Sequence, residues 1–378
     1  MSQDNPALQA PEYIQAIQPY IPGKPIEDLV REYGLSPENV VKLASNENPM
    51  GMPASARKAI ESVISGLSRY PDPGGYDLKQ TIATRLDVPA SWVTLGNGSN
   101  DILEMLGIAL LDQDSAAVYS QYSFVVYRLA TQARGAQHRM VPAVDYGHDL
   151  PGMLQAIDEQ TRVVFIANPN NPTGTFLGHD AIESFVSQVY QRFGSRVTVV
   201  LDEAYNEFIE PDQRVDSVSL VRRYSNVVVT RSFSKVYGLA GLRVGYALAQ
   251  PALTELLARV RQPFNVNTLA QVAAIAALAD DAFVTASAQN NAQGKDVLQS
   301  GFEKLGLTYV PSFANFVLVK VGDAVGINQA LLKRGVIVRP VAADGLPEWL
   351  RVTIGLPHEN QRFLDALTEV LQTAERSA

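Results

Sequence analysis

The sequence predicts an α/β protein in which a mostly parallel sheet lies between two layers of helices. From about residue 92, short runs rich in β-branched residues alternate with longer stretches of helical spacing. Several of these runs, namely VVFIA, VTVVL and VVVT, are continuously apolar, which is typical of strands that are covered on both faces. A chain of 378 residues is also long enough to form a second domain beside this sheet.

The strands of the first domain are expected in short runs separated by helices. The strand candidates are Trp92–Leu95, Ala116–Tyr119, Val163–Ala167, Val197–Leu201 and Val227–Thr230. Between them, Asp101–Leu111 and Asp180–Phe193 have the spacing of amphipathic helices. We therefore expect a large domain over residues 46–265.

The pattern changes after Pro263 and predicts a smaller α+β domain over residues 266–378. Its helices are expected at Thr268–Leu278, Asp281–Leu305, Ile327–Lys333 and Glu359–Ala374, and its strands at Leu307–Pro311, Phe316–Val321, Val336–Val341 and Leu350–Ile354. Residues 1–45 are rich in proline and glycine, so we expect an N-terminal arm that packs with the small domain.

Composition excludes several classes of function. The net charge of −8 provides no positive field for a nucleic-acid partner. The absence of cysteine excludes thiolate metal sites and cysteine nucleophiles. The N-terminal stretch lacks the basic cluster and apolar core of a secretory signal, and no run has the length of a membrane span. We therefore expect a cytoplasmic enzyme with no membrane partner.

Lys235 is the most specific candidate for catalysis. It lies in TRSFSKVYGLAGLRVGY, just beyond the expected strand Val227–Thr230. A lysine held beyond a buried strand loses hydration, which lowers the pKa of its amine and makes the amine available to attack a carbonyl. Two other interpretations stay open from the residues alone. Lys235 can be a surface lysine, or part of the S-x-x-K motif of penicillin-recognising enzymes, whose companion motifs S-D-N and K-T-G are absent.

Asp202 is the second candidate and follows the apolar run VTVVL in LDEAYNEF. Ligands of open α/β sheets bind at the carboxyl ends of the strands, where this carboxylate is expected. A protonated pyridinium nitrogen would satisfy a buried carboxylate there. A helix cap or a salt bridge in the core would satisfy it equally well.

Two further loops follow expected strands. NPNNPTG, residues 168–174, has the composition of a rigid turn. An ordinary loop between a strand and a helix can have the same composition. GNGSND, residues 96–101, brings Ser99 and Asn100 to the start of a helix, where free N–H groups bind phosphate or receive a simple cap. Asp101 stands where a dinucleotide-binding fingerprint has its last glycine.

Together these motifs resemble those of the pyridoxal-phosphate-dependent aminotransferases of the aspartate-aminotransferase fold. The matching segments, in order, are QPYIPGKP, LASNENPMG, RYPDPGG, GNGSND, SQYSFVVY, NPNNPTG, DEAY, SFSK with GLAGLRVGY, and RVTIG, and they extend over nearly the whole chain. The resemblance implies pyridoxal 5'-phosphate as cofactor and the fold called type I among enzymes that use it. It is strongest to the members that act on histidinol phosphate.

The resemblance implies roles for residues around the cofactor ring. Lys235 would form the internal aldimine and then move the proton between the substrate carbon and the cofactor. Asp202 would keep the pyridine nitrogen protonated, so that the ring accepts negative charge. Asn171 and Tyr205 would bond to the phenolic oxygen, and Tyr122 would stack on the ring.

It also implies how the cofactor phosphate is held. Five residues would contribute, with the guanidinium as the main charged contact: Ser99, Asn100, Ser232, Ser234 and Arg243. The family's GSDE reads GSND here, and Asn100 keeps the backbone N–H that such a loop uses.

The implied substrate site depends on two late arginines and on a dimer. Arg351 would grip an α-carboxylate in a bidentate pair, and Arg339 would bind the far end of a substrate with a second anionic group. Asn46 is also expected to contact substrate. Tyr70 and Tyr20 would act across the interface of a homodimer, at the cofactor phosphate and at the substrate, although aromatic packing can explain both.

The implied reaction interconverts histidinol phosphate and imidazole acetol phosphate, with glutamate and 2-oxoglutarate as the other pair, in a ping-pong sequence. An aromatic amino-acid aminotransferase on the same scaffold is one alternative, and a decarboxylase of phosphate-bearing amino acids is another. The four histidines, His138, His148, His179 and His358, have no metal-ligand spacing, so no metal is expected.

Overall fold

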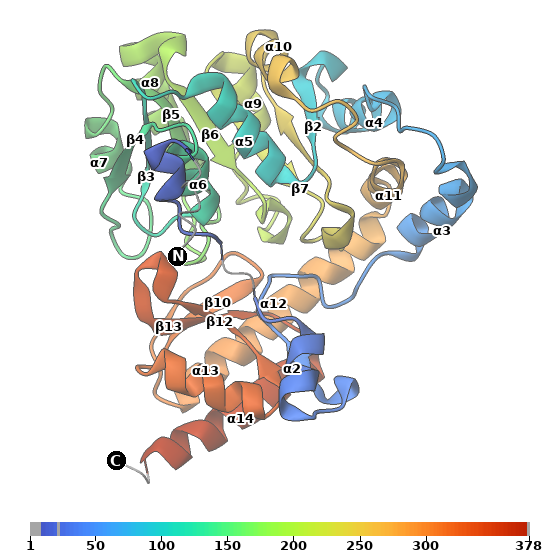
Figure 1. Cartoon of the computed structure of the whole chain (residues 1–378), viewed down its shortest axis with the longest axis vertical. Helices are drawn as coiled ribbons and strands as arrows, with labels where there is room; N and C mark the ends of the chain where they lie inside the picture. The colour runs from blue at the N-terminus through green and yellow to red at the C-terminus, as the bar shows by residue number, and fades with distance from the viewer. Residues whose placement is uncertain (1–8, 21–22, 376–378) are drawn as a thin grey trace, which may run out of the picture.

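The computed structural model describes residues 9–20 and 23–375, with a larger unit built on a seven-stranded sheet above a smaller unit (Figure 1). The large sheet has the strand order β2-β8-β7-β6-β5-β3-β4. These strands are β2 (Val93–Gly96), β8 (Gly245–Leu248), β7 (Val227–Ser232), β6 (Thr198–Asp202), β5 (Thr161–Ala167), β3 (Ala116–Ser120) and β4 (Gln137–Val141). Within this sheet, β8 runs antiparallel to both of its neighbours and the other pairs are parallel, which confirms the mostly parallel sheet expected from the sequence.

The register of the sheet gathers the ends of several strands at one edge. Ala167 at the end of β5 pairs with Asp202 at the end of β6. Gly96 at the end of β2 and Ser232 at the end of β7 both pair with Gly245, the first residue of β8. The loops that leave β2, β5, β6 and β7 therefore start side by side, at the edge where open α/β sheets bind ligands.

Both faces of this sheet are covered by helices, which explains the continuously apolar runs. Val163 and Phe165 of β5 lie in one core cluster, while Val164 and Ile166 lie in another on the opposite face. The first face packs against α5 (Ser99–Leu110), α6 (Val125–Gln132) and α10 (Pro251–Val260). The second packs against α4 (Tyr76–Leu86), α7 (Leu150–Gln155), α8 (His179–Phe193), α9 (Ser217–Arg223) and α11 (Thr268–Leu278), with α3 (Ala54–Val63) on α11.

The smaller unit is an antiparallel sheet with three helices. Its strand order is β12-β13-β10-β9, with β12 (Arg339–Val341), β13 (Leu346–Thr353), β10 (Phe316–Lys320) and β9 (Tyr309–Val310). The helices are α12 (Asp281–Lys304), α13 (Ala324–Lys333) and α14 (Pro357–Glu375). Their apolar side chains form one cluster with Val317, Val319 and Val352 of the sheet.

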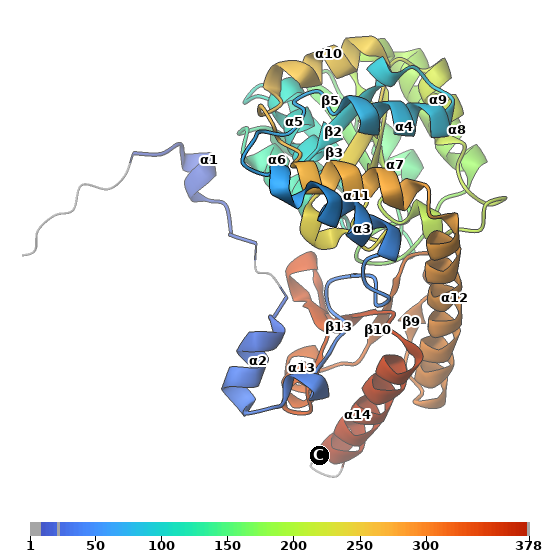
Figure 2. The same ribbon diagram turned by 90° about the vertical axis from the view of Figure 1, so that its right-hand side faces the viewer.

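The N-terminal segment joins this smaller unit. Strand β1 (Val41–Lys42) pairs in parallel with β11 (Val336–Ile337). Leu29 of α2 (Ile26–Tyr33) is buried with Leu332 and Ile337. Further out, the short helix α1 (Glu12–Gln15) lies apart from the smaller unit, as Figure 2 shows. Tyr13 of α1 contacts the large unit near Gly135.

The boundary between the two units differs from the expected division at residues 265 and 266. The alanine-rich helix α11 was expected in the small domain, but Ala270, Ala273 and Ala277 are buried in the core of the large unit. Small side chains let α11 approach α3 closely, which places it in that core. The change of unit therefore falls between α11 and α12, and α12 runs down from the large unit along the small one (Figure 1).

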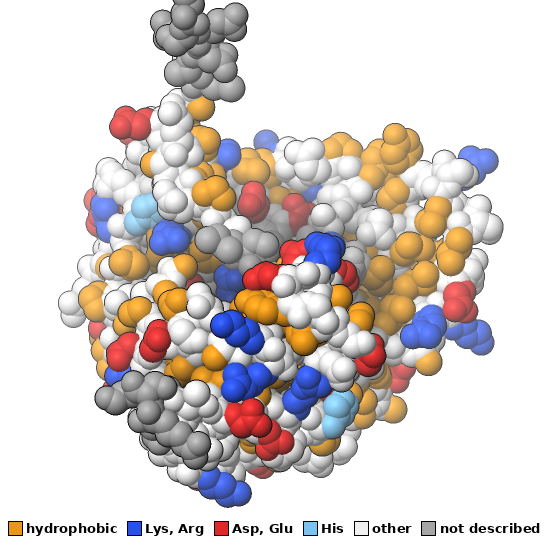
Figure 3. Space-filling model, turned by 60° about the horizontal axis from the view of Figure 1, so that its bottom comes forward, with side chains coloured by type: hydrophobic (Ala, Val, Ile, Leu, Met, Phe, Trp, Pro, Cys, Tyr) orange, Lys and Arg blue, Asp and Glu red, His pale blue; other side chains and the backbone are white. Residues whose placement is uncertain are grey.

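The remaining elements are short 3-10 helices: η1 (Pro37–Asn39), η2 (Ile64–Gly66), η3 (Ala90–Trp92), η4 (Gly194–Arg196), η5 (Asn206–Phe208), η6 (Ala240–Leu242) and η7 (Ala342–Asp344). Within residues 9–20 and 23–375, no single helix is long and apolar enough to cross a membrane. The pair α11 and α12 passes the length and composition test together, but it bends by 81°. On the face shown in Figure 3, acidic and basic side chains are interspersed.

Candidate active site

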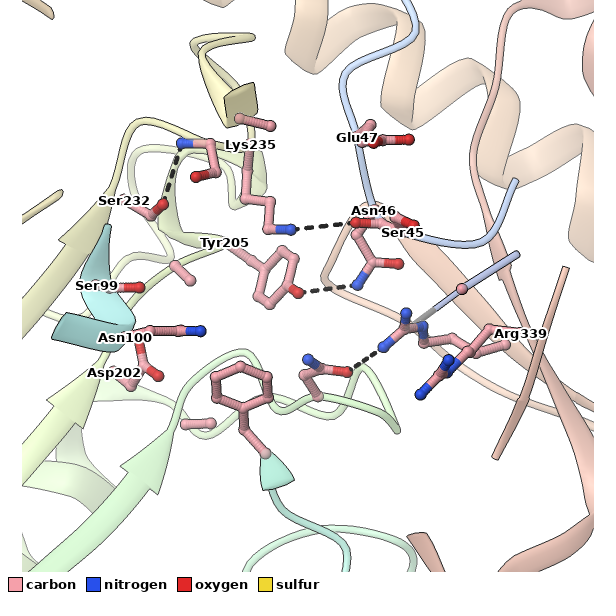
Figure 4. Close-up of a pocket in the computed structure, with 18 of the residues that line it drawn as sticks. Ser45, Asn46, Glu47, Ser99, Asn100, Asp202, Tyr205, Ser232, Lys235 and Arg339 are labelled. Atoms are coloured by element: carbon pink, nitrogen blue, oxygen red, sulfur yellow. Dashed lines mark hydrogen bonds between the residues drawn. The ribbon is translucent and has the colours of Figure 1, made fainter. Parts of the chain in front are cut away.

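A cavity of about 390 Å³ lies between the carboxyl edge of the large sheet and the smaller unit. Residues from both units and from the N-terminal segment line it, as Figure 4 shows. Of the expected site residues, the lining includes Tyr20, Asn46, Ser99, Asn100, Asn171, Asp202, Tyr205, Ser232, Ser234, Lys235, Arg243, Arg339 and Arg351. The structure thus brings together residues that are more than 300 positions apart in the sequence.

Lys235 projects into this cavity from the turn that follows β7. Its Nζ donates a hydrogen bond to the backbone oxygen of Ser45 at 3.4 Å and lies 5.6 Å from the centre of the Tyr205 ring (Figure 4). Burial is the larger cause and the positive charge of Arg351 the second, and together with the other nearby charges they lower the pKa of Lys235 to about 8. A substantial fraction of the amine is therefore unprotonated near neutral pH, as a nucleophile or base requires.

Asp202 is the last residue of β6 and is buried at the floor of the cavity. Its Oδ2 accepts a hydrogen bond from the Tyr127 hydroxyl at 2.8 Å, and its Oδ1 accepts one from Thr230 Oγ1 at 3.0 Å. Burial raises the pKa of Asp202, since these neutral donors compensate only part of the lost hydration. A cationic group placed beside the carboxylate would restore its charge.

A cluster of anion-binding groups lines the cavity on the side of the large sheet, where Figure 4 also labels Asp202. Ser99 begins α5, and Arg243 donates from Nη1 to Ser234 Oγ at 3.2 Å. Gly98 before the helix has a φ of +83°, and a Cβ at this position would lie 2.3 Å from Nη2 of Arg243. Glycine therefore lets the arginine lie against the start of the helix. Guanidinium, hydroxyl and helix N–H groups together suit a phosphate.

Two further hydrogen bonds join side chains that line the cavity. Asn46 Nδ2 donates to the Tyr205 hydroxyl oxygen at 2.9 Å (Figure 4). Arg351 Nη1 donates to Asn171 Oδ1 at 2.7 Å. Burial raises the pKa of Tyr205 to about 12, so its hydroxyl stays protonated at neutral pH and can donate a hydrogen bond.

Arg339 and Arg351 form a second cationic cluster on the small-domain side. They are directly opposite each other on the antiparallel strands β12 and β13, which places both guanidinium groups on one face of the sheet. Arg351 is held by the backbone oxygen of Ala44 at 2.8 Å, and the Arg339 guanidinium lies 5.4 Å from the Tyr20 ring centre. Two like charges at a directly opposed pair repel each other, so this arrangement favours a bound anion.

Besides Tyr20 and Tyr205, the aromatic ring that lines the cavity is that of Phe124 and not that of Tyr122, which was expected there. Tyr122 does not line the cavity; its ring is 6.1 Å from that of Tyr146 and packs on the small-domain cluster that includes Trp349. The chain turns over residues 121–123 before α6, and Phe124, two positions after Tyr122, lines the cavity. Both aromatic residues occur in SQYSFVVY, and the sequence gives no reason to choose between them.

The two tyrosines expected at a dimer interface lie in different places. Tyr20 lines the cavity of its own chain, where its ring lies against the Arg339 guanidinium, and its action across a dimer interface stays a prediction. Tyr70 is 82% exposed, stacks on Phe264 with ring centres 4.6 Å apart, and does not line the cavity.

Three contacts at the site were not anticipated from the sequence. Tyr127 and Thr230 bind the Asp202 carboxylate from buried positions that look like ordinary core residues. Ser45 contributes through its backbone carbonyl, which no side-chain pattern can indicate. Tyr127 is a buried tyrosine of α6, three positions after Phe124, which precedes the helix, and their ring centres are 5.9 Å apart.

The donor set fits a flat aromatic cation that carries a phosphate. The cavity offers an anion-binding cluster at one end, a buried carboxylate on its floor, a weakly basic amine, and the face of Phe124. Among the described residues, no group of three or more histidine, aspartate or glutamate side chains is arranged to hold a metal ion.

Comparisons relate the chain to known proteins. The family described as aminotransferase class I and II matches residues 38–367. Histidinol-phosphate aminotransferase 2 of Ralstonia nicotianae is 56% identical over 372 residues, covering 97% of this chain and 98% of that one. Histidinol-phosphate aminotransferase 1 of Cupriavidus pinatubonensis is 57% identical over 366 residues, covering 96% of each. The crystal structure of histidinol-phosphate aminotransferase from Sinorhizobium meliloti in complex with pyridoxal-5'-phosphate has a TM-score of 0.87 at 28% identity, covering 99% of each chain.

Proposed function

The chain belongs to the class I and II aminotransferase family, and we propose that it moves the amino group of histidinol phosphate to 2-oxoglutarate, giving imidazole acetol phosphate and glutamate. The similarity to histidinol-phosphate aminotransferases over nearly the whole chain supports this substrate. Within the site, the main support for this substrate is the pair Arg339 and Arg351, which lie opposite each other on β12 and β13. They form a second anion-binding cluster in the same cavity as the one around Arg243.

The enzyme works with pyridoxal 5'-phosphate, and the cavity residues fit that cofactor. Arg243 with the serines at 99, 232 and 234 and the N–H of Asn100 would hold its phosphate. Asp202 would pair with its ring nitrogen, and Phe124 would cover its ring face. When bound, the cofactor supplies a carbonyl that takes up the amino group and a ring that withdraws electrons from the substrate carbon.

The chain's own residues would then handle charge and protons. Lys235 Nζ, with its pKa lowered to about 8 mainly by burial, would take the proton from the substrate carbon that bears the amino group and deliver it to the carbon of the cofactor's former carbonyl group. The Asp202 carboxylate would regain its charge beside a ring cation. Tyr205 and Asn171 would donate hydrogen bonds to the ring oxygen.

A pair of guanidinium groups suits both halves of a ping-pong reaction. The proposed amino donor carries one dianionic phosphate, and the proposed acceptor carries two carboxylates. Arg339 and Arg351 can bind either class of anion in a forked geometry, so one pocket can serve both substrates in turn. The single charge of an aromatic amino acid's carboxylate would balance only one of the two guanidinium charges, whereas a phosphate dianion balances both.

The test is a half-reaction with the enzyme carrying cofactor but no 2-oxo acid. Loss of the bound cofactor's visible absorbance in a stopped-flow instrument should be much faster with histidinol phosphate than with phenylalanine. The reverse order would reject the proposed substrate in favour of an aromatic amino-acid aminotransferase. Release of carbon dioxide from a phosphate-bearing amino acid, without any need for 2-oxoglutarate, would instead identify a decarboxylase.

We also propose a homodimer in which each site receives a residue from its partner. Exposed apolar side chains at Ile64, Leu67, Tyr70 and Tyr76 lie on consecutive segments next to α3 and α4 and support an interface there. Tyr70 is the proposed contribution to the partner's phosphate site. A cytoplasmic location stays a prediction from the sequence.

A further inference from the structure

Asn46 bridges the two units at the centre of the site. Its backbone N–H donates to Thr353 Oγ1 at 2.9 Å, and its backbone oxygen accepts from Asn315 Nδ2 at 3.0 Å. Its side chain reaches the other way, to the Tyr205 hydroxyl of the large unit. Asn46, Thr353 and Tyr205 are all less than 5% exposed. This set of bonds is therefore protected from competing water.

The hydrogen bonds fix which end of the Asn46 amide faces Tyr205. Thr353 Oγ1 already accepts the backbone N–H of Asn46, and it lies 3.1 Å from Asn46 Oδ1, to which it can give its own proton. With Oδ1 occupied by that donor, Nδ2 is left to face the Tyr205 oxygen at 2.9 Å. The opposite amide orientation would leave the Thr353 proton without an acceptor among these groups.

This orientation determines where the Tyr205 proton points. A phenol has one proton to donate, and an N–H donor facing its oxygen cannot accept that proton. The proton of Tyr205 must therefore be directed away from Asn46, toward the cavity that Tyr205 lines together with Lys235. The charged or titratable groups near the Tyr205 hydroxyl are Lys235, Asp202, Arg351 and Tyr20.

We propose that Asn46 is a positioning residue, which acts through Tyr205 by holding the phenol as a hydrogen-bond donor to the ring oxygen of the cofactor. This role differs from the substrate contact that the family resemblance implies for Asn46. It rests on the cofactor part of the proposed function and not on the identity of the substrate.

The anchor of Asn46 is also linked to the substrate-binding strand. Thr353 and Arg351 are two positions apart on β13, so their side chains lie on the same face of the small sheet. Tyr205 belongs to the large unit, with Ala314 and Phe316 of the small unit packed against it. The Asn46 side chain thus connects the strand that would bind the substrate anion with the phenol that would bind the cofactor.

The test uses the variant Asn46→Asp in the enzyme with cofactor and without substrate. Asn46 has a φ of +56°, and aspartate tolerates this left-handed conformation as asparagine does, so the backbone is retained. The carboxylate accepts hydrogen bonds only, so it would draw the Tyr205 proton toward itself. A hydrogen bond from Tyr205 would stabilise the negative charge on the cofactor's ring oxygen. Without that bond, the bound cofactor would keep its proton up to a higher pH. The pH midpoint of the bound cofactor's visible absorbance should therefore rise by about one unit or more.

Three comparisons separate this effect from charge and misfolding. Asn48→Asp adds the same charge two positions away, where the side chain bonds to the Val236 oxygen and Ser287 and not to Tyr205, and should shift the midpoint less. Asn46→Gly keeps the left-handed backbone and removes the amide without adding charge, and its midpoint should rise by a smaller amount. In a Tyr205→Phe background, Asn46→Gly should add almost nothing.

An Asn46→Asp midpoint shift no larger than that of Asn48→Asp would overturn the proposal. So would an effect of Asn46→Gly that persists in full without the Tyr205 hydroxyl. A raised KM with an unchanged midpoint would likewise overturn it, by assigning Asn46 to substrate contact alone. A different natural substrate would leave all of these midpoints unaffected, because no substrate is present in the titration.

Discussion

At the scale of single residues, the buried carboxylate of Asp202 makes the folded protein less stable at neutral pH when no cationic cofactor ring lies beside it. Burial raises the pKa of its carboxyl, so the folded protein without cofactor holds that proton more tightly than the unfolded chain does. The stability that this contributes is present below the ordinary pKa of aspartate and is lost as the pH rises through the raised pKa.

The variant Asp202→Asn should therefore separate stability from activity. With cofactor and substrates, kcat should fall about a hundredfold or more, because removing one partner of a buried ion pair costs about 3–5 kcal/mol. Without cofactor at pH 7, the variant should unfold at a higher temperature than the wild type, and this difference in unfolding temperature should vanish in acid. Calorimetry at several pH values measures it. A variant that is less stable than the wild type at pH 7 would contradict the prediction, because the hydrogen bonds from Tyr127 and Thr230 would then outweigh the cost of burying the charge.

The buried environment of Lys235 should lower the pH at which its amine becomes reactive. Burial lowers its pKa to about 8, so at pH 8 about half of the amine is unprotonated, against less than a hundredth for an ordinary lysine. Competitive labelling of the cofactor-free protein with acetic anhydride, followed by peptide mass spectrometry, should give a midpoint near 8 for Lys235. Lys58, an exposed lysine on α3, is the internal control for an amine in contact with water. A Lys235 midpoint equal to that of Lys58 would contradict the desolvated amine.

Sequence reasoning placed the chemistry of the site better than its packing. The loops at the carboxyl ends of β2, β5, β6 and β7 could be located because parallel strands must end at one edge. The choice between Tyr122 and Phe124 could not be made, since it depends on how one loop turns. The bond from Asn46 to Tyr205 joins residues 159 positions apart and depends on how the two units dock.

At the scale of elements, the turn between β2 and α5 shows how a backbone conformation creates a charged site. Gly98→Ala would place a Cβ 2.3 Å from Nη2 of Arg243 in a backbone conformation with φ of +83°. The Kd for the cofactor should rise about tenfold or more, because a displaced guanidinium loses a charge-assisted hydrogen bond. Gly178→Ala is the matched control, since a Cβ there meets no atom within 4 Å and its Kd should not change. Fluorescence titration of the cofactor-free proteins measures both values, and equal Kd values would contradict this reading of the turn.

Helices and strands with a strong apolar pattern could be predicted from the sequence. Strands that form only through pairing with a neighbouring strand could not. The expected strands over Val163–Ala167 and Val227–Thr230 correspond to β5 and β7, and the long expected helix over Asp281–Leu305 corresponds to α12. Strand β4 was not predicted because its sequence, QHRMV, has little apolar character. The expected strand over Val336–Val341 corresponds to β11 and β12 together. Strand β1 was not predicted, because it is two residues long and exists only through its pairing with β11.

At the scale of the whole molecule, the small unit and the N-terminal segment complete the site. Arg339 and Arg351 come from the small sheet, while Asp202 ends β6 of the large sheet and Lys235 lies in the turn after β7. The assignment of α11 to the small domain failed because composition alone does not say which core an alanine-rich helix joins. The contact of α11 with α3 determines that α11 joins the large unit, and this contact between distant segments could not be predicted from the sequence.

The proposed dimer predicts complementation between two inactive variants. Tyr70→Ala and Lys235→Ala should each lose most of their activity alone. If Tyr70 serves the partner's site, a dimer with one copy of each variant has one intact site. Unfolding and refolding an equal mixture should then restore about a quarter of the wild-type specific activity, because half of the dimers are mixed. Mixed dimers with no recovered activity would place Tyr70 at the site of its own chain or outside any site.

The most direct test of the account is the covalent attachment of the cofactor at Lys235. Holoenzyme treated with borohydride and digested should yield one peptide, the one that contains Lys235, with the mass of the reduced cofactor added, and Lys235→Ala should yield none. A cofactor found on another lysine, or released entirely by denaturation after reduction, would contradict the assignment of this cavity as the aminotransferase site.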